Sequence, residues 1–299
     1  MTGATGFIGA AVAKALADGG YDVTALTRHP DDYTGAGRAV YADIADGESL
    51  RRALEGQEAA YYLVHSLAAD DFTVRDRAGA TAFAAAATGA GLRQVVYLGG
   101  LGDDRDELSE HLRSRREVES ILLHGAPTTA LRAGIVIGDG SISWEILRQL
   151  VERLPVMITP RWVQTKTQPI ALGDTLVDLV GVLGKTETIG EVYDIGGREV
   201  LTYLDMMVIT SRVMDRHRVI VAVPLLSPRL SSHWLRLITD VDLTTARALV
   251  DSLTNEVVVR DHRLDELLGH TPMTFAEAAA NALAARVERR AAAEVRAHP

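Results

Sequence analysis

The chain opens with a glycine triplet that predicts a dinucleotide-binding loop. Its first nine residues read MTGATGFIG, which places Gly3, Gly6 and Gly9 in a G-x-x-G-x-x-G pattern. In such a loop one glycine makes a tight turn, one lets backbone N–H groups approach a pyrophosphate, and one lets the following helix pack closely on a sheet. The helix N-terminus adds the positive end of its dipole. An apolar stripe with helical spacing follows, which favours a phosphate loop over an ordinary glycine-rich turn.

The strand that should carry this loop is nearly absent, because only Met1 and Thr2 precede Gly3. In a doubly wound sheet of order 3-2-1-4-5-6 that strand is central, and its loss leaves its neighbours roughly 10 Å apart. Two interpretations remain open: the natural start lies upstream, or the sheet closes around the absence. We expect a truncated or misplaced start, and we expect that an upstream apolar strand would raise stability and cofactor affinity.

Composition excludes several classes of protein. The 299 residues suffice for one large or two modest domains, and no apolar run approaches the ~20 residues of a membrane span. The N-terminus lacks the basic and apolar regions of a signal peptide, and the chain has no cysteine, which fits a cytoplasmic protein. A formal charge of −9 argues against a nucleic-acid partner. The histidines show no metal-binding spacing, so we expect no metal site.

Alternating strand and helix patterns up to about residue 138 predict an α/β fold with a parallel sheet. Strands are expected at 21–27, 38–42, 59–64, 94–98 and 128–137, with helices at 47–55, 72–88 and 108–124. Beyond residue 140 the rhythm changes. There we expect helices at 143–154, 171–183, 202–214, 231–238, 244–253 and 274–296, strands at 191–195, 219–223 and 256–260, and an irregular stretch at 155–169.

An ordered set of motifs spans nearly the whole chain. It comprises TGATGFIG at 2–9, LTRHP at 26–30, Asp43, VVYLGGL at 95–101, SRREVE at 114–119, LRAGIVIG at 131–138, QPI at 168–170 and EVYDIGG at 191–197. This set resembles the extended and atypical short-chain dehydrogenase/reductase superfamily, and within it the NmrA-like and YbjT-like NAD(P)H-binding proteins. The resemblance implies a Rossmann-type doubly wound domain over residues 1–140 and a smaller substrate-binding region over 141–299, with 171–196 returning to the Rossmann sheet.

The same resemblance implies a set of cofactor contacts. Asp43 and Ile44 would lie near the adenine, and Leu63, Val64 and His65 along the nicotinamide side, partly through backbone atoms. The remaining expected contacts are Gly3, Thr5, Gly6, Phe7, Ile8, Gly9, Arg28, Gly99 and Arg115.

The end of the second expected strand predicts the cofactor type. Sites that prefer NAD place an acid about 20 residues past the glycine loop to hold the ribose 2′-hydroxyl. Here the strand ends Thr27-Arg28-His29, and no acid follows until Asp31. The planar guanidinium of arginine suits a 2′-phosphate. We therefore expect NADP(H) rather than NAD(H); the alternative is that Arg28 is a solvated turn residue.

The residues usual for catalysis in this superfamily are replaced. Typical members use Ser, Tyr and Lys, the last two as Y-x-x-x-K. Here His111 stands at the tyrosine position, Arg115 at the lysine position, and Gly99-Gly100 at the serine position. His111 could exchange protons near neutrality, whereas Arg115 could only bind ribose hydroxyls or a phosphate. The alternative for His111 is a polar pocket or surface residue.

Two functions remain in competition. The first is an NADP(H)-dependent oxidoreductase acting on a small molecule in a pocket that would include Trp144, Arg161, Trp162 and Gln168, although isolated tryptophans more often belong to a core. The second is a non-catalytic NADP(H)-binding redox sensor of NmrA-like type, which the loss of Ser, Tyr and Lys favours. The sequence does not identify the substrate or the oligomeric state.

Overall fold

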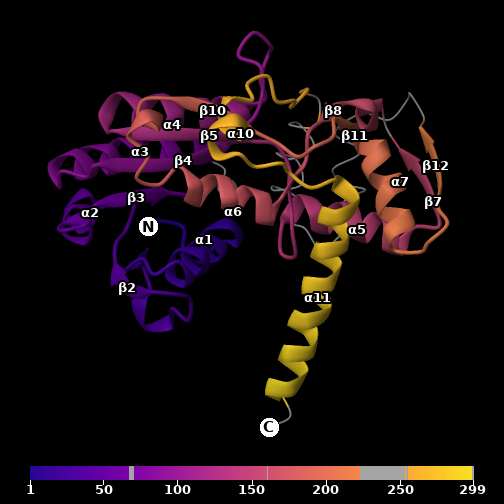
Figure 1. Ribbon diagram of the computed structural model, residues 1–299, viewed down its shortest axis with the longest axis horizontal. Helices are drawn as coiled ribbons and strands as arrows, with labels where there is room; N and C mark the ends of the chain where they lie inside the picture. The colour runs from indigo at the N-terminus through magenta and orange to yellow at the C-terminus, as the bar shows by residue number, and fades with distance from the viewer. Residues whose placement is uncertain (67–70, 160, 223–252, 254, 298–299) are drawn as a thin grey trace.

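A computed structural model describes residues 1–66, 71–159, 161–222, 253 and 255–297 (Figure 1). Its centre is a parallel sheet with helices on both faces, which confirms the expected α/β Rossmann-type fold. Four strands pair in the order β10-β5-β4-β3, and two more pair as β1-β2, all in parallel. They are β1 (Thr24–Thr27), β2 (Arg38–Tyr41), β3 (Ala59–Tyr62), β4 (Gln94–Gly100), β5 (Thr128–Ala133) and β10 (Val192–Ile195).

Met1 and Thr2 lie between β1 and β3, where the central strand of a doubly wound sheet belongs. The Thr2 N–H donates to the Tyr61 carbonyl at 3.0 Å, and the Leu26 N–H donates to the Met1 carbonyl at 2.9 Å. No strand is assigned within residues 1–6, all of which are described, so the link between the two sheets is this pair of buried residues. Burial lowers the pKa of the Met1 α-amino group to about 5, and this group donates to the Thr24 carbonyl.

The two faces of the sheet are covered by different helices (Figure 1). One face packs against α2 (Gly47–Leu54), α3 (Phe72–Gly89) and α4 (Glu110–Gly125), and the other against α1 (Phe7–Asp18), α6 (Leu172–Gly181) and α10 (Arg263–Leu268). Neighbouring strand residues such as Tyr61 and Tyr62 belong to opposite cores, as strand alternation requires. The short helix α10 has no counterpart among the expected elements.

The chain beyond Gly138 builds a third core against one end of the sheet. It is formed by α5 (Ile142–Arg153), α7 (Tyr203–Val213) and the start of α11 (Phe275–Ala297). The stretch expected to be irregular contains short strands, and residues 256–260 make only an isolated bridge, Thr167 to Val257. The short strands pair as β6 (Val136–Ile137) with β9 (Ile170–Ala171), β7 (Val156–Thr159) with β12 (Val219–Ala222), and β8 (Lys166–Thr167) with β11 (Leu201–Thr202).

Three single-turn helices complete the described elements: η1 (Pro30–Asp32), η2 (Arg161–Gln164) and η3 (Thr186–Thr188). The helix expected at 231–238, and that at 244–253 apart from residue 253, lie outside the described residues. None of the described helices combines the length and the apolar character that a bilayer crossing requires.

Candidate active site

The glycine loop adopts a conformation that only glycine fits at two positions. Gly3 has φ +71°, and a Cβ atom on it would lie 2.6 Å from the Leu63 carbonyl oxygen. A Cβ atom on Gly9 would lie 2.0 Å from the Gly3 carbonyl oxygen. The Gly6 N–H donates to that same carbonyl at 3.0 Å and closes the turn. The loop is therefore pressed against both β3 and its own helix, as a phosphate loop requires.

The N-terminus of α1 is open to an anion. Its N-cap, Gly6, supplies no side-chain hydrogen bond, and its first turn holds no acidic residue. Thr5 and Gly6 are exposed. The first N–H groups of a helix have no partner within it, so this end offers donors and a positive dipole end together. The Phe7 ring packs against Gly138, where an added Cβ atom would lie 2.8 Å from the ring, and this contact braces the loop on the end of β6.

The ends of β1 and β2 hold the residues expected at the adenosine side. Arg28 is exposed directly after β1, and within the described chain no hydrogen bond or ion pair engages its guanidinium. Asp43 follows β2, where one of its carboxylate oxygens accepts the Ala45 N–H at 2.9 Å. The Ile44 side chain packs over Gly79 of α3. Arg28 thus remains available for a ligand, whereas Asp43 and Ile44 also shape the turn.

The end of β3 brings His65 onto His111, the second residue of α4. Their rings stack with centroids 5.1 Å apart and planes inclined by 29°. The Nδ1 atom of His111 is buried and has no hydrogen-bond partner among the described residues. Desolvation by burial, and then the charge of Arg115, lowers the pKa of His111 to about 4. Although part of His65 faces solvent, its pKa is also lowered, first by desolvation and then by Arg115 and His111. Both rings are therefore neutral at neutral pH.

Arg115 is buried and bound within the protein. Its Nη2 lies 3.5 Å from an Asp76 carboxylate oxygen, and its Nη1 lies 3.5 Å from the Val64 carbonyl. Asp76 also accepts the Ser66 N–H at 3.1 Å and the Ser114 hydroxyl at 3.3 Å. The Nε of Arg115 is buried without a partner among the described residues. The cation at the lysine position is thus bound to α3 and to the residues that follow β3, and within the described part of the chain its Nε has no partner.

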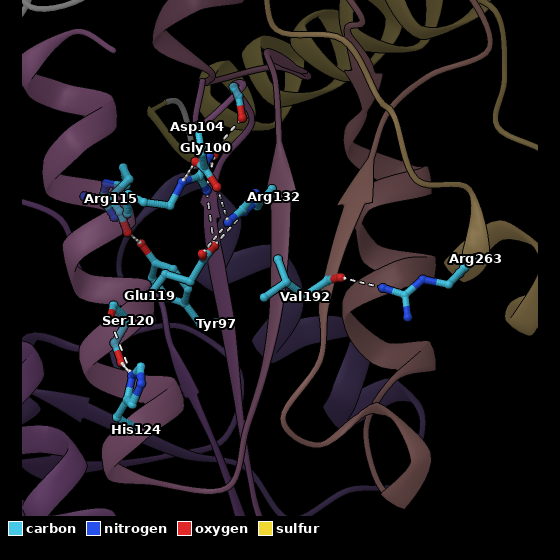
Figure 2. Close-up of polar contacts among 12 residues, drawn as sticks. Tyr97, Gly100, Asp104, Arg115, Glu119, Ser120, His124, Arg132, Val192 and Arg263 are labelled. Carbon is cyan, nitrogen blue, oxygen red and sulfur yellow. Dashed lines mark hydrogen bonds and ion pairs between the residues drawn. The ribbon is translucent and has the colours of Figure 1, made fainter. Parts of the chain in front are cut away.

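At the serine position, an added Cβ atom would meet neighbouring side chains rather than backbone. A Cβ atom on Gly100 would lie 2.8 Å from a methyl group of Leu112, and one on Gly99 would lie 2.9 Å from the Tyr97 ring. The absence of side chains at the end of β4 lets the first turns of α4 approach the strand. The Tyr97 hydroxyl donates to the Arg115 carbonyl at 3.1 Å, which ties α4 to β4 (Figure 2).

A charged network fixes the loop between β4 and α4. Figure 2 shows Arg132 of β5 reaching Glu119 of α4, with bonds of 2.9 and 2.7 Å from its Nε and Nη2. Arg116 joins the same network: it donates to Asp104 at 2.5 Å and to the Gly102 carbonyl at 2.9 Å. The loop after β4 is therefore held in place by Asp104, which pairs with Arg116 of α4 and Arg132 of β5.

The residues expected to line a substrate pocket separate into two groups. Trp144 is fully buried in the third core, and Gln168 is buried with its amide bonded to the Gly197 carbonyl at 2.7 Å and the Val259 N–H at 3.0 Å. Arg161 and Trp162 belong to η2, and their side chains are outside the described part of the structure. Both polar ends of the Gln168 amide are thus used in hydrogen bonds within the fold. The sequence indicated neither these bonds nor the pairing of Arg115 with Asp76. Among the described residues, no group of three or more His, Asp and Glu side chains could hold a metal ion.

Residues 3–149 match the model of a family described as NAD(P)H-binding, and this match covers the loop, the histidine pair and Arg115. The N-terminal half of the chain therefore belongs to this NAD(P)H-binding family. The loop geometry agrees with this match, because the close contacts of Gly3 with the Leu63 backbone and of Gly9 with the Gly3 backbone both lie within residues 3–149.

Two relatives of this NAD(P)-binding chain are reductases. The (4-alkanoyl-5-oxo-2,5-dihydrofuran-3-yl)methyl phosphate reductase of Streptomyces griseus is 29% identical over 230 residues, which is 72% of this chain and 73% of the relative. The ceramide reductase of Caulobacter vibrioides is 28% identical over 269 residues, covering 85% of this chain and 78% of the relative. Among solved structures, an NADPH-dependent quinone oxidoreductase from Escherichia coli, complexed with NADPH, has the same fold with a TM-score of 0.74 at 21% identity, covering 93% of this chain and 97% of that one.

Proposed function

We propose that this protein is an NADP(H)-dependent oxidoreductase that reduces an electron-poor double bond in a small, largely apolar molecule. The observation that carries the proposal is the His65–His111 stack, in which the Nδ1 of His111 has no partner among the described residues. The stack lies just beyond the carboxyl end of β3, where Gly3 of the loop contacts the Leu63 backbone. In open α/β sheets ligands bind at this edge. A buried polar atom without a partner calls for a ligand or water to satisfy it.

The residues present fit a dinucleotide. The close approaches at Gly3 and Gly9 leave the backbone free to contact a pyrophosphate, and the open N-terminus of α1 offers donors to it. Arg28 would hold a 2′-phosphate, and Leu63 to His65 would line the nicotinamide. When bound, the nicotinamide ring supplies the hydride.

His111 would act as a neutral hydrogen-bonding group. Because burial lowers its pKa to about 4, almost none of it is in the protonated, cationic form at neutral pH, and it is a poor general acid. A neutral imidazole can still donate one hydrogen bond to a substrate oxygen and stabilise the charge that develops there. The proton that completes the reduction would come from water. Arg115 would strengthen this stabilisation through its charge and hold the end of β3 through the Val64 carbonyl.

The names of the relatives support this class of substrate. One acts on an oxo-dihydrofuran that bears an alkanoyl chain, one is named for ceramide, and the structural neighbour is a quinone oxidoreductase. A dihydrofuranone and a quinone share a double bond that a carbonyl group polarises. We therefore propose an enone or related carbonyl compound with an apolar substituent as the substrate.

Turnover tests the proposal directly. Purified protein is incubated with NADPH and a panel of acylated butenolides, quinones and long-chain ketones, and loss of the nicotinamide absorbance is followed. We expect turnover with at least one conjugated carbonyl compound, and loss of that turnover in His111→Leu with NADPH affinity retained. Tight NADPH binding with no turnover across the panel would contradict the proposal.

A non-catalytic redox sensor is the second candidate function, and one observation favours it. Arg115, the cation at the lysine position, is paired with buried Asp76, so the negative charge of Asp76 offsets part of its positive charge. For a sensor of NmrA-like type, oxidised and reduced cofactor should bind with different affinities and no tested substrate should be reduced. Comparing NADP⁺ and NADPH affinities alongside the turnover panel separates the two functions.

The cofactor preference has its own test in Arg28→Ala. Charge-assisted hydrogen bonds to a phosphate contribute about 1.5–3 kcal/mol, so NADPH affinity should fall about tenfold to a hundredfold while NADH affinity stays unchanged. Arg93→Ala is the matched control, because Arg93 is an exposed arginine that lies beside the start of β4, at the opposite edge of the sheet, and pairs with Glu58 at 3.0 Å. Equal NADPH affinity in Arg28→Ala and wild type would assign Arg28 to solvent.

A further inference from the structure

Residues 255–260 contact the loop that leads into α4. The side-chain oxygen of Asn255 accepts the Ser109 N–H at 3.0 Å, and its amide nitrogen donates to the Glu107 carbonyl at 2.9 Å. The side chain is buried, with the residue 8% exposed, and it joins positions about 146 residues apart in the chain. The Asn255 side chain thus provides hydrogen-bond partners for two backbone groups of this loop, which forms neither a helix nor a strand.

Two further contacts press the same segment onto the loop. Val257 and Val259 pack in a small apolar cluster with Leu101, Leu108 and Leu112. The neighbouring Arg260 pairs with Asp103 at 2.6 Å, and its backbone N–H donates to Asp194 of β10 at 3.1 Å. The loop is therefore clamped between the network around Glu119 on one side and residues 255–260 on the other.

We propose that Asn255 is a positioning residue that sets the first turn of α4 and thereby holds His111 against His65. This inference rests on the proposed function, in which His111 contacts the substrate. Ser109 is the N-cap of α4, and its hydroxyl accepts the Leu112 N–H at 3.3 Å. Because His111 lies two residues beyond Ser109, a shift of the N-cap moves its ring directly. Misplacement of a contacting group by about 1 Å can cost a hundredfold in rate.

The environment of His111 supplies a readout that needs no substrate. Among the described residues, the charged and titratable groups around its ring are Arg115 on its own helix and His65 after β3, with Asp76 of α3 behind Arg115. If the first turn of α4 loosens, water reaches the ring and its contact with His65 weakens. The pKa of His111 should then rise from about 4 towards its ordinary value, and NMR titration of the ring, assigned with a His111→Gln sample, measures it.

The test compares Asn255→Ala with Gln94→Ala. Gln94 is an equally buried amide whose side chain also bonds to backbone, including the Val182 carbonyl at 3.0 Å and the Gly184 N–H at 2.8 Å, but it lies at the opposite end of β4. Both variants should lose stability. In Asn255→Ala alone, the pKa of His111 should rise by about one unit or more. With an active substrate, kcat should also fall about tenfold to a hundredfold while NADPH affinity stays within about twofold.

Asn255→Gln is the conservative variant. Its amide keeps both an acceptor for the Ser109 N–H and a donor for the Glu107 carbonyl without adding charge, so the pKa of His111 should rise less than in Asn255→Ala. If Asn255→Ala does not fold, Asn255→Ser replaces it, because the serine side chain is shorter than that of asparagine and loses the two bonds while remaining polar. An unchanged pKa of His111 in the Ala or Ser variant, or an equal rise in Gln94→Ala, would overturn the proposal. Because this readout needs no turnover, absence of activity in wild type would overturn the proposed function while leaving the positioning of His111 separately measured.

Discussion

At the scale of single residues, the glycines of the loop are fixed by steric exclusion. Gly9 has no space for a Cβ atom because the Gly3 carbonyl already lies where that atom would stand. Backbone cannot retreat as a flexible side chain can, so any substitution there must move the loop or the helix. The same exclusion that keeps Gly9 small also presents the N-terminus of α1 to a ligand.

Gly9→Ala should therefore abolish NADPH binding and destabilise the fold by about 1–3 kcal/mol, as overpacking does. Gly89→Ala is the matched control, since a Cβ atom there meets nothing within 4 Å and the position lies at the end of α3. The control should be neutral or stabilise by up to about 1 kcal/mol. Urea unfolding and NADPH titration of both variants check this, and wild-type NADPH affinity in Gly9→Ala would refute the steric argument.

The low pKa of His111 links stability to pH. In the unfolded chain this histidine takes up a proton near pH 6.5, whereas in the fold it does so only near pH 4. Between these values the unfolded state binds more protons, so the contribution to stability is complete above about pH 6.5 and is lost as pH falls towards 4. At pH 5 the loss of stability should be about 1–2 kcal/mol. His111→Gln should reduce the dependence measured by urea unfolding; an identical pH profile in the variant would contradict the buried neutral ring.

At the scale of elements, α6 carries a buried acid that is best kept protonated. Asp178 is almost fully buried, and one of its oxygens has no partner among the described residues. Desolvation, and then the charges of Asp265 and Asp174, raises its pKa to about 8. Asp174, one turn earlier, is instead satisfied by His270 and by the Met273 N–H, each at 3.0 Å. Of the two carboxyl groups on α6, that of Asp174 accepts hydrogen bonds, whereas that of Asp178 is desolvated and favours its protonated form.

Asp178→Asn should stabilise the protein at pH 8. Because the folded pKa exceeds the unfolded one, the favourable contribution is complete below about pH 4 and is lost as pH rises through 8. The neutral amide removes that loss, with an expected gain of about 1–3 kcal/mol at pH 8 and little at pH 5. Asp174→Asn should destabilise at both values. Urea unfolding of both variants decides the matter, and a less stable Asp178→Asn at pH 8 would show that the carboxylate is needed.

Local patterns made the main elements predictable, whereas partners distant in the sequence were not. The glycine spacing predicts α1 and its loop because each requirement is set within nine residues. The choice between a ligand contact and an internal ion pair for Arg115 depends on Asp76, which lies on another helix. Likewise, nothing near Asn255 indicates that it caps a loop far earlier in the chain. The helix α10 was missed because six residues are too few for a periodic pattern.

At the scale of the whole molecule, the sheet is held together at its centre by a very short connection. Met1 and Thr2 bond to β1 on one side and β3 on the other, whereas β3, β4, β5 and β10 pair along their lengths. A two-stranded sheet has little stability of its own, so β1-β2 depends on this connection and on the packing of α1.

Native-state hydrogen exchange should therefore show two levels of protection. Amides of β1 should exchange through openings of lower free energy than amides of β4. NADPH should narrow this difference in opening free energy, because its proposed contacts at Arg28 and at residues 63–65 would lie on both sides of the connection. The comparison uses Ala25 in β1 and Val96 in β4, both fully buried. Equal opening free energies without cofactor would mean that the sheet unfolds as one unit.

Equilibrium titration of the protein with NADPH and with NADH, followed by nicotinamide fluorescence, tests the central claim most directly. A working glycine loop with Arg28 at the 2′-phosphate predicts saturable binding at about micromolar concentration, with NADPH bound about tenfold or more tightly than NADH. Absence of binding by either nucleotide would contradict the dinucleotide site itself, and tighter binding of NADH would contradict the assignment of Arg28.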